Sequence, residues 1–141
     1  SIDREASRLV CRMPTDQPMP FTEAQRPSYP RHVAGAVMVQ VTGMLGFAHF
    51  YYVEGKRHGD GWVGCGATIE HAAFRKLVPP GGIIEATCWA KRSRIGQVRH
   101  FLRYAFDFRH EGDLCYESEQ SAIWLHTGHG ADIDQLNETS A

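Results

Sequence analysis

The most regular pattern of hydrophobic and polar positions lies toward the C-terminal end of the chain. Residues 98–110 alternate in polarity, and this period of two predicts a half-buried β-strand. One face of that strand would hold Val98, His100, Leu102, Tyr104, Phe106 and Phe108. The sequence Glu111-Gly112-Asp113 is a hairpin signal, so residues 114–125 are predicted to pair back antiparallel.

Two more strands are predicted upstream of this hairpin. These strands are predicted at residues 62–74 and at residues 83–92. The Pro79-Pro80-Gly81-Gly82 sequence between them is a strong turn signal. A further turn is expected at residues 93–96. The second half of the chain therefore predicts a meander of about four strands.

Residues 33–53 form the most apolar stretch and contain no formal charge. The stretch is long enough to cross a bilayer, but Gln40, Thr42 and His49 interrupt it. A helix that is apolar on every side can also be the buried centre of a globular fold. We therefore predict a buried helix over residues 34–52 and no membrane span.

The segment before this helix is rich in proline. Five prolines between residues 13 and 32 exclude a helix there and predict a long ordered loop. Residues 6–12 alternate weakly and predict a short first strand. One helix next to a strand meander indicates an α+β fold in which a curved antiparallel sheet wraps the helix, and a dimer partner would cover the rest of it.

Composition and charge narrow the functional classes. The chain has 141 residues, 43% of them apolar and 22% charged, which suits one domain over residues 1–141, with a core of about 6–125 and a polar tail at 126–141. The net charge of −1 argues against a general nucleic-acid binder. The four cysteines form no C-x-x-C pair, so we expect free thiols, a cytoplasmic location, no metal and no cofactor.

Two motifs and the order of elements resemble the β-hydroxyacyl-acyl-carrier-protein dehydratases, which have the hot-dog fold. Residues 34–40 (AGAVMVQ) are similar to that family's opening of the central helix. Residues 74–81 (FRKLVPPG) are similar to its turn between strands. The resemblance spans roughly residues 20–125 and implies a dimeric enzyme whose substrate is an acyl thioester on acyl carrier protein or coenzyme A.

The resemblance also assigns catalytic positions, and the sequence departs from it at two of them. The glycine that polarises the thioester carbonyl corresponds to Gly35, but the family's acid falls on Gln40 and its loop histidine falls near Arg26. Neither an amide nor a guanidinium exchanges protons near neutral pH. His32, at the start of the same helix, is the candidate replacement base, and Gln40 is a candidate hydrogen-bond donor to the thioester.

The remaining predicted contacts follow from the same resemblance. Substrate contacts are expected from Arg26, Tyr29, Ala36, Val37, Val41 and Phe47. A cationic rim that attracts an acidic carrier is expected from Arg75, Lys76, Arg92 and Arg94.

Three functions remain open at this point. The first, which is our main interpretation, is a dehydratase of fatty-acid or polyketide-type biosynthesis with altered catalytic groups. The second is a hot-dog thioesterase, for which a carboxylate is expected; residues 33–53 contain none, which leaves Glu54, Glu70 and Glu85. The third is a non-catalytic subunit that binds acyl thioesters, and the loss of both acid–base positions favours it.

Overall fold

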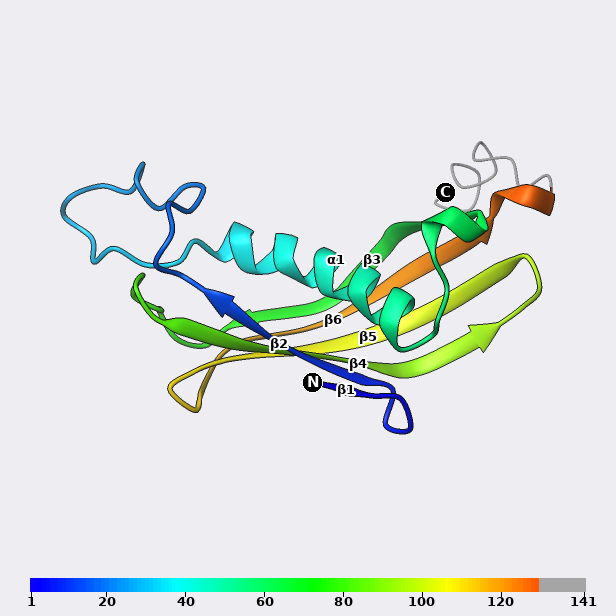
Figure 1. The fold of residues 1–141 in the computed structure, drawn as a ribbon. Helices are drawn as coiled ribbons and strands as arrows, with labels where there is room; N and C mark the ends of the chain where they lie inside the picture. The colour runs from blue at the N-terminus through cyan, green and yellow to red at the C-terminus, as the bar shows by residue number, and fades with distance from the viewer. Residues whose placement is uncertain (130–141) are drawn as a thin grey trace.

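A computed structural model describes residues 1–129 as one helix packed on one face of a curved antiparallel sheet (Figure 1). The elements are β1 (Ile2–Asp3), β2 (Arg8–Pro14), α1 (Gly35–Tyr52), η1 (His58–Asp60), β3 (Trp62–Phe74), β4 (Ile83–Ile95), β5 (Arg99–His110), β6 (Asp113–His126) and η2 (Thr127–His129). The six strands lie in the order β1-β2-β4-β5-β6-β3. The predicted α+β class with one central helix is confirmed.

The β5–β6 hairpin forms as the alternating pattern predicts. On β5 the even-numbered residues from His100 to Phe108 are buried on the face that α1 covers. The connecting residues Glu111 and Gly112 both have positive φ, at 52° and 86°, which is the type I′ geometry that matches the twist of the two strands. Val98 lies just before β5 and is only half-buried.

Strand boundaries differ from the prediction in three places. The two-residue strand β1 was not predicted, and β2 begins at Arg8, after a turn in which Ser7 has a φ of 47°. Strand β4 continues to Ile95, so the predicted turn at residues 93–96 is wrong. Ser93 and Arg94 pair in register with Leu102 and Phe101 on β5, and this ladder outweighs the local turn tendency of the sequence.

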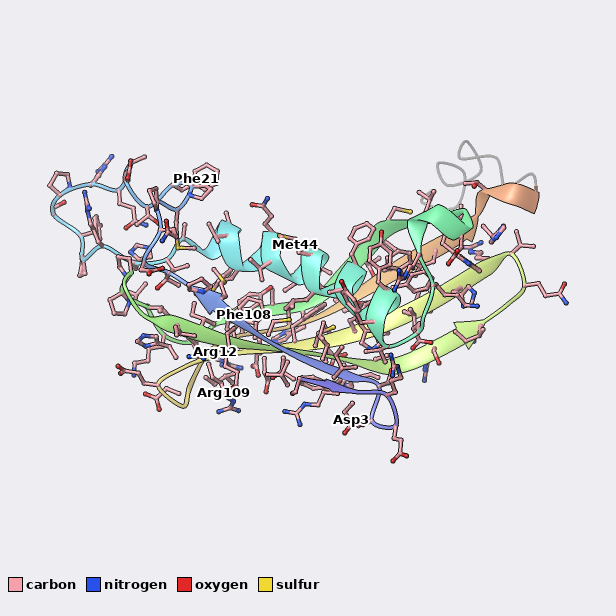
Figure 2. The ribbon with its side chains drawn as sticks, viewed as in Figure 1. Asp3, Arg12, Phe21, Met44, Phe108 and Arg109 are labelled. Atoms are coloured by element: carbon pink, nitrogen blue, oxygen red, sulfur yellow. The ribbon has the colours of Figure 1, made fainter. Side chains whose placement is uncertain are left out.

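Helix α1 buries one side and exposes the other. Its buried residues include Val37, Met38, Leu45 and Phe50, and the Phe50 ring stacks on Trp124 of β6 with centroids 3.7 Å apart. The opposite side is exposed at Gln40, Met44 and Tyr52. In Figure 2, Met44 lies on the side of α1 away from the sheet, whereas Phe108 lies between the helix and the sheet.

The sheet therefore covers α1 on one side only. Exposed apolar residues on the other side, such as Met44, are not covered by the sheet. In residues 1–129 no helix has the length and apolar character needed to cross a bilayer.

The predicted proline-rich loop connects β2 to α1, and both of its ends are hydrogen-bonded to the connection between β3 and β4. Thr15 is buried, and its hydroxyl donates to the carbonyl of Gly82 at 3.1 Å. Near the other end, the Val33 amide donates to the Val78 carbonyl at 2.8 Å. Strand β6 and η2 occupy residues up to His129, so only residues 130–141 of the predicted polar tail lie outside the described part of the chain.

Candidate functional site

A pocket lies between the middle of α1 and the strands β3, β5 and β6. It encloses about 70 Å³, or about 390 Å³ with its open mouth. The lining residues are Thr42, Gly43, Gly46, Phe47, Gly64, Cys65, Gly66, Tyr104, Phe106, Gln120, Ser121, Ala122 and Trp124. A mostly apolar concavity with a few polar groups is the usual form of a small-molecule site.

Small residues on two facing elements leave this space open. Gly43 and Gly46 lie on α1, and Gly64 and Gly66 lie on β3. A Cβ at Gly64 would come within 2.3 Å of the Trp124 ring, so the indole can lie against β3 only because this residue is glycine. A Cβ at Gly43, in contrast, would have no atom within 4 Å.

Thr42 and Gln120 are the polar pair in the pocket. The Thr42 hydroxyl donates to the Val39 carbonyl at 2.6 Å, so its oxygen accepts from the Gln120 Nε2, which lies 2.8 Å away. Gln120 Nε2 also donates to the Ser118 hydroxyl at 3.1 Å. Both amide hydrogens are thus used, and the orientation of the amide is fixed. The Gln120 Oε1 accepts no hydrogen bond within residues 1–129 and is available to a ligand or a water.

Aromatic rings form the rest of the wall. Phe47 meets Trp124 edge to face, with ring centroids 5.0 Å apart. Tyr104 is 2% exposed, and burial raises the pKa of its hydroxyl, so the group stays neutral. This aromatic wall is suited to an apolar group.

Glu70 on β3 is held on the outer face of the sheet, the face away from α1. It accepts from Ser121, whose register partner on β5 is Arg103, from Thr68 at 2.8 Å, and from Arg103 at 3.0 Å. Desolvation alone would raise its pKa, but these donors together lower the pKa to about 2. A carboxylate with so low a pKa is a weak proton acceptor near neutral pH.

The residues predicted at the start of the helix lie outside this pocket. Gly35 is covered by Phe74, because a Cβ there would lie 2.6 Å from the phenylalanine ring. Val37 is buried in the core, and Val41 packs against the core from a half-buried position. Ala36 is exposed. Among the predicted substrate contacts, the structure places only Phe47 in the pocket lining.

The predicted polar residues of the loop and of the first helix turns are not brought together. The side chain of Gln25 makes two hydrogen bonds to the backbone of His32. Its Nε2 donates to the His32 carbonyl at 2.8 Å, and its Oε1 accepts from the His32 amide at 3.0 Å. His32 Nδ1 lies 2.9 Å from the Pro30 carbonyl, which only accepts, so Nδ1 donates this hydrogen bond. Gln40 is exposed on α1. No hydrogen bond among residues 1–129 joins Gln40 to His32.

Arg26 and Tyr29 lie on the surface of the proline-rich loop. Both side chains are exposed, Tyr29 at 64%. The Tyr29 amide donates to the Arg26 carbonyl at 3.0 Å and closes a turn. Neither residue lines the pocket under α1.

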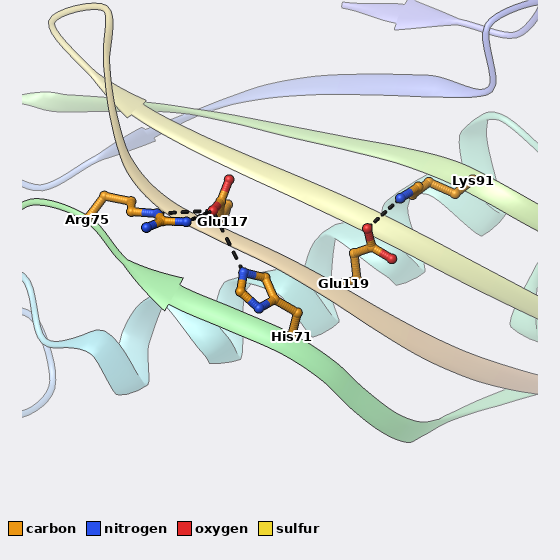
Figure 3. Close-up of polar contacts among 5 residues, drawn as sticks. All are labelled: His71, Arg75, Lys91, Glu117 and Glu119. Atoms are coloured by element: carbon orange, nitrogen blue, oxygen red, sulfur yellow. Dashed lines mark hydrogen bonds and ion pairs between the residues drawn. The ribbon is translucent and has the colours of Figure 1, made fainter.

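The predicted basic rim divides into two separate groups. Arg75 pairs with Glu117 near the end of β3, where His71 lies 3.7 Å from the same carboxylate (Figure 3). Lys76 pairs with Asp113. Arg92 and Arg94 lie on β4 beyond Lys91, whose partner is Glu119, and the register places them toward the other end of the sheet.

Sequence reasoning missed the polar pair at the centre of the pocket. Thr42 and Gln120 are distant in sequence, and neither belongs to a recognised motif. The available signals were glycines at two helix and two strand positions, which leave space, and a glutamine among the inward-facing residues of β6.

Solved structures that are similar to this one include several thioesterases. A mutant of the fluoroacetyl-CoA-specific thioesterase FlK, in complex with fluoroacetate and coenzyme A, has a TM-score of 0.64 and 16% identity over 87% of this chain and 95% of that chain. A thioesterase from Haemophilus influenzae has a TM-score of 0.59 and 18% identity over 84% and 72% of the two chains. Thioesterase superfamily member 2 from Mus musculus has a TM-score of 0.56 and 12% identity over 81% and 72%.

No protein-family model and no curated protein matches the sequence. The structural similarity extends over most of the chain and, at these identities, shows the fold alone. The three proteins are thioesterases, so the narrower resemblance to dehydratases stays a prediction. One helix on a curved, six-stranded antiparallel sheet, shared with these enzymes, gives this chain the hot-dog fold.

Proposed function

We propose that this protein hydrolyses thioesters of short acyl groups. The observation that supports it is the pocket under α1, where the oriented Thr42–Gln120 pair meets an apolar aromatic wall, in a fold that known thioesterases share. The enclosed part of the pocket, about 70 Å³, is smaller than the roughly 300–1,000 Å³ typical of small-molecule sites. That size suits an acyl group of a few carbons better than a long chain.

The proposed chemistry is an attack of water on the thioester carbonyl. Gln120 Oε1 accepts a hydrogen bond from the water and orients it, while Thr42 and Ser118 hold the amide in place. The water oxygen bonds to the carbonyl carbon, the carbon–sulfur bond breaks, and the leaving sulfur takes the proton. The products are a carboxylic acid and a free thiol.

The proposed enzyme is a homodimer in which a second copy closes the pocket. Strand β3 is the last in the sheet order, and residues 66–72 are exposed along it. The pocket-lining residues Gly64 and Gly66 lie on the same strand, so a partner strand paired there would form one wall of the site. The same partner would cover the exposed side of α1 at Met44.

The acyl carrier is proposed to be coenzyme A or an acyl carrier protein. Arg75, Lys76, Arg92 and Arg94 supply positive charge for its phosphate or acidic groups. We also propose a cytoplasmic location. The four cysteines support it because all are free thiols, as is usual in a reducing compartment.

Release of free thiol from a series of acyl-CoA substrates, from acetyl to palmitoyl, tests the proposal. We expect turnover with short acyl groups and little with palmitoyl. Gln120→Leu should lower kcat/KM about 100-fold, the size of effect seen when an oriented active-site amide is removed. Gln17→Leu, the same change in the exposed loop, should leave the rate unchanged. No thiol release at any chain length would overturn the proposal.

A second candidate is binding of acyl thioesters without hydrolysis. It is favoured by one observation: among the described residues, no histidine and no carboxylate lines the pocket. Saturable binding of acetyl-CoA with no release of thiol would support this candidate. A separate incubation with 3-hydroxyacyl-CoA, analysed by mass spectrometry, tests for a dehydratase. Only a dehydratase would form an enoyl product.

A further inference from the structure

Three arginines gather around one aromatic ring on the outer face of the sheet, opposite α1. Arg92 and Arg94 lie two residues apart on β4 and therefore point to the same face. Phe101 lies directly opposite Arg94 in the β4–β5 register, and Arg99 lies two residues from Phe101 on β5. These four residues line an open concavity of about 550 Å³, which is called the arginine pocket below.

The charges of the arginine pocket are not neutralised by neighbouring carboxylates. In residues 1–129 two of the outer-face acids pair with other bases: Glu119 with Lys91, and Glu70 with Arg103. No ion pair in this part of the chain includes Arg92, Arg94 or Arg99. Three uncompensated like charges so close together are unfavourable by themselves, and a bound anion would relieve their repulsion.

The shape of this cluster indicates the kind of anion. A guanidinium group binds phosphate oxygens in a bidentate geometry, and three guanidinium groups together can bind more than one phosphate. The Phe101 ring, half-buried between them, offers a flat apolar surface on which a base can stack. Four residues in a concavity suit a small molecule, whereas a docked protein would need a much wider surface.

We propose that the arginine pocket binds a nucleotide, with phosphates on Arg92, Arg94 and Arg99 and the base on Phe101. This inference goes beyond the proposed function, because binding requires no thioester. The nucleotide is either the adenosine end of coenzyme A or a free nucleotide. Arg99 lies near Cys65 on the outer face of the sheet, whereas the pocket under α1 lies on the other face.

Isothermal titration calorimetry with 3′,5′-ADP, coenzyme A, ATP and pyrophosphate tests the inference. We expect Arg94→Gln and Arg99→Gln each to weaken nucleotide binding tenfold or more. The matched control is Arg12→Gln, which removes an exposed arginine at the other end of the outer face and should leave binding unchanged (Figure 2). Phe101→Leu should weaken the nucleotides several-fold and leave pyrophosphate unchanged.

The ligand series separates the two sources of the nucleotide. Tighter binding of coenzyme A and 3′,5′-ADP identifies the thioester carrier, and tighter binding of ATP identifies a free nucleotide; either result supports the site. If Arg12→Gln weakens binding as much as Arg94→Gln, the attraction is diffuse and the inference is wrong. It is also wrong if no nucleotide binds, or if pyrophosphate binds as tightly as the nucleotides.

Hydrolysis provides an independent readout. Arg94→Gln should raise KM for acetyl-CoA but leave KM for S-acetyl-N-acetylcysteamine, which has no nucleotide, unchanged if coenzyme A is the ligand. Failure of hydrolysis with nucleotide binding intact would refute the proposed function and leave this site standing. Hydrolysis without any nucleotide binding would refute this site and leave the proposed function standing.

Discussion

At the residue scale, Glu70 shows how three strands combine to hold one ionised group. Its donors come from Thr68 on its own strand, from Ser121 on β6 and from Arg103 on β5. Because the folded state lowers the pKa of Glu70 to about 2, from an ordinary value of 4.5, folding favours the carboxylate. This contribution to stability is complete above pH 4.5 and is lost as the pH falls from 4.5 toward 2.

Glu70→Gln is predicted to remove that pH-dependent contribution. Wild type should exceed the variant in free energy of unfolding by about 1 kcal/mol at pH 7, the upper end for partly exposed ion pairs, and the difference should shrink by pH 3. Urea denaturation at the two pH values measures it. Glu85→Gln, an exposed glutamate without an ion pair among residues 1–129, is the control. A difference for Glu70→Gln that is the same at both pH values would contradict the assignment.

At the element scale, the sequence predicted what depends on local pattern. The alternation of residues 98–110 and the Glu111-Gly112 turn gave β5 and its hairpin, since both signals lie within a few residues of the structure they specify. The end of β4 was misplaced, because its ladder with β5 is a non-local interaction. The apolar run predicted α1, but a helix apolar on all sides does not indicate which side faces the sheet.

Among residues 1–129 no strand pairs with the outer edge of β3, and its proposed pairing with a second copy can be tested. Ile69 is 55% exposed near the middle of this edge strand. Ile69→Lys places a charge there, which is the usual protection of a strand edge against pairing, and should convert the dimer to a monomer. Light scattering after size-exclusion chromatography measures the mass.

The control for this prediction lies at the opposite edge of the sheet. Ile2 is 47% exposed on β1, and Ile2→Lys should leave the dimer intact. A wild-type protein that is monomeric, or an Ile69→Lys variant that remains a dimer, would refute pairing through β3.

At the scale of the whole molecule, the site is a product of the fold. Thr42 on α1, Gly64 on β3, Tyr104 on β5 and Gln120 on β6 meet only because of the strand order and the position of the helix. Neither the periodicity of the sequence nor its short motifs indicate that these four residues lie close together in space. Of the six substrate contacts expected from the sequence, only Phe47 lines this pocket, and the structure adds the polar pair beside it.

The central claim, that an acyl group enters the pocket under α1, is tested most directly by filling that pocket. Gly43 lines it, lies within a helix, and has open space where a side chain would go. Replacing a helical glycine by alanine or leucine favours the helix by up to about 1 kcal/mol, so Gly43→Ala and Gly43→Leu should stay folded.

The decisive measurement is kcat/KM for acetyl-CoA hydrolysis by wild type, Gly43→Ala and Gly43→Leu, with a thermal melt of each. We predict unchanged or higher melting temperatures, an intermediate rate for the alanine variant, and a loss of at least tenfold for the leucine variant. A folded Gly43→Leu protein that hydrolyses acetyl-CoA at the wild-type rate would show that the acyl group binds elsewhere.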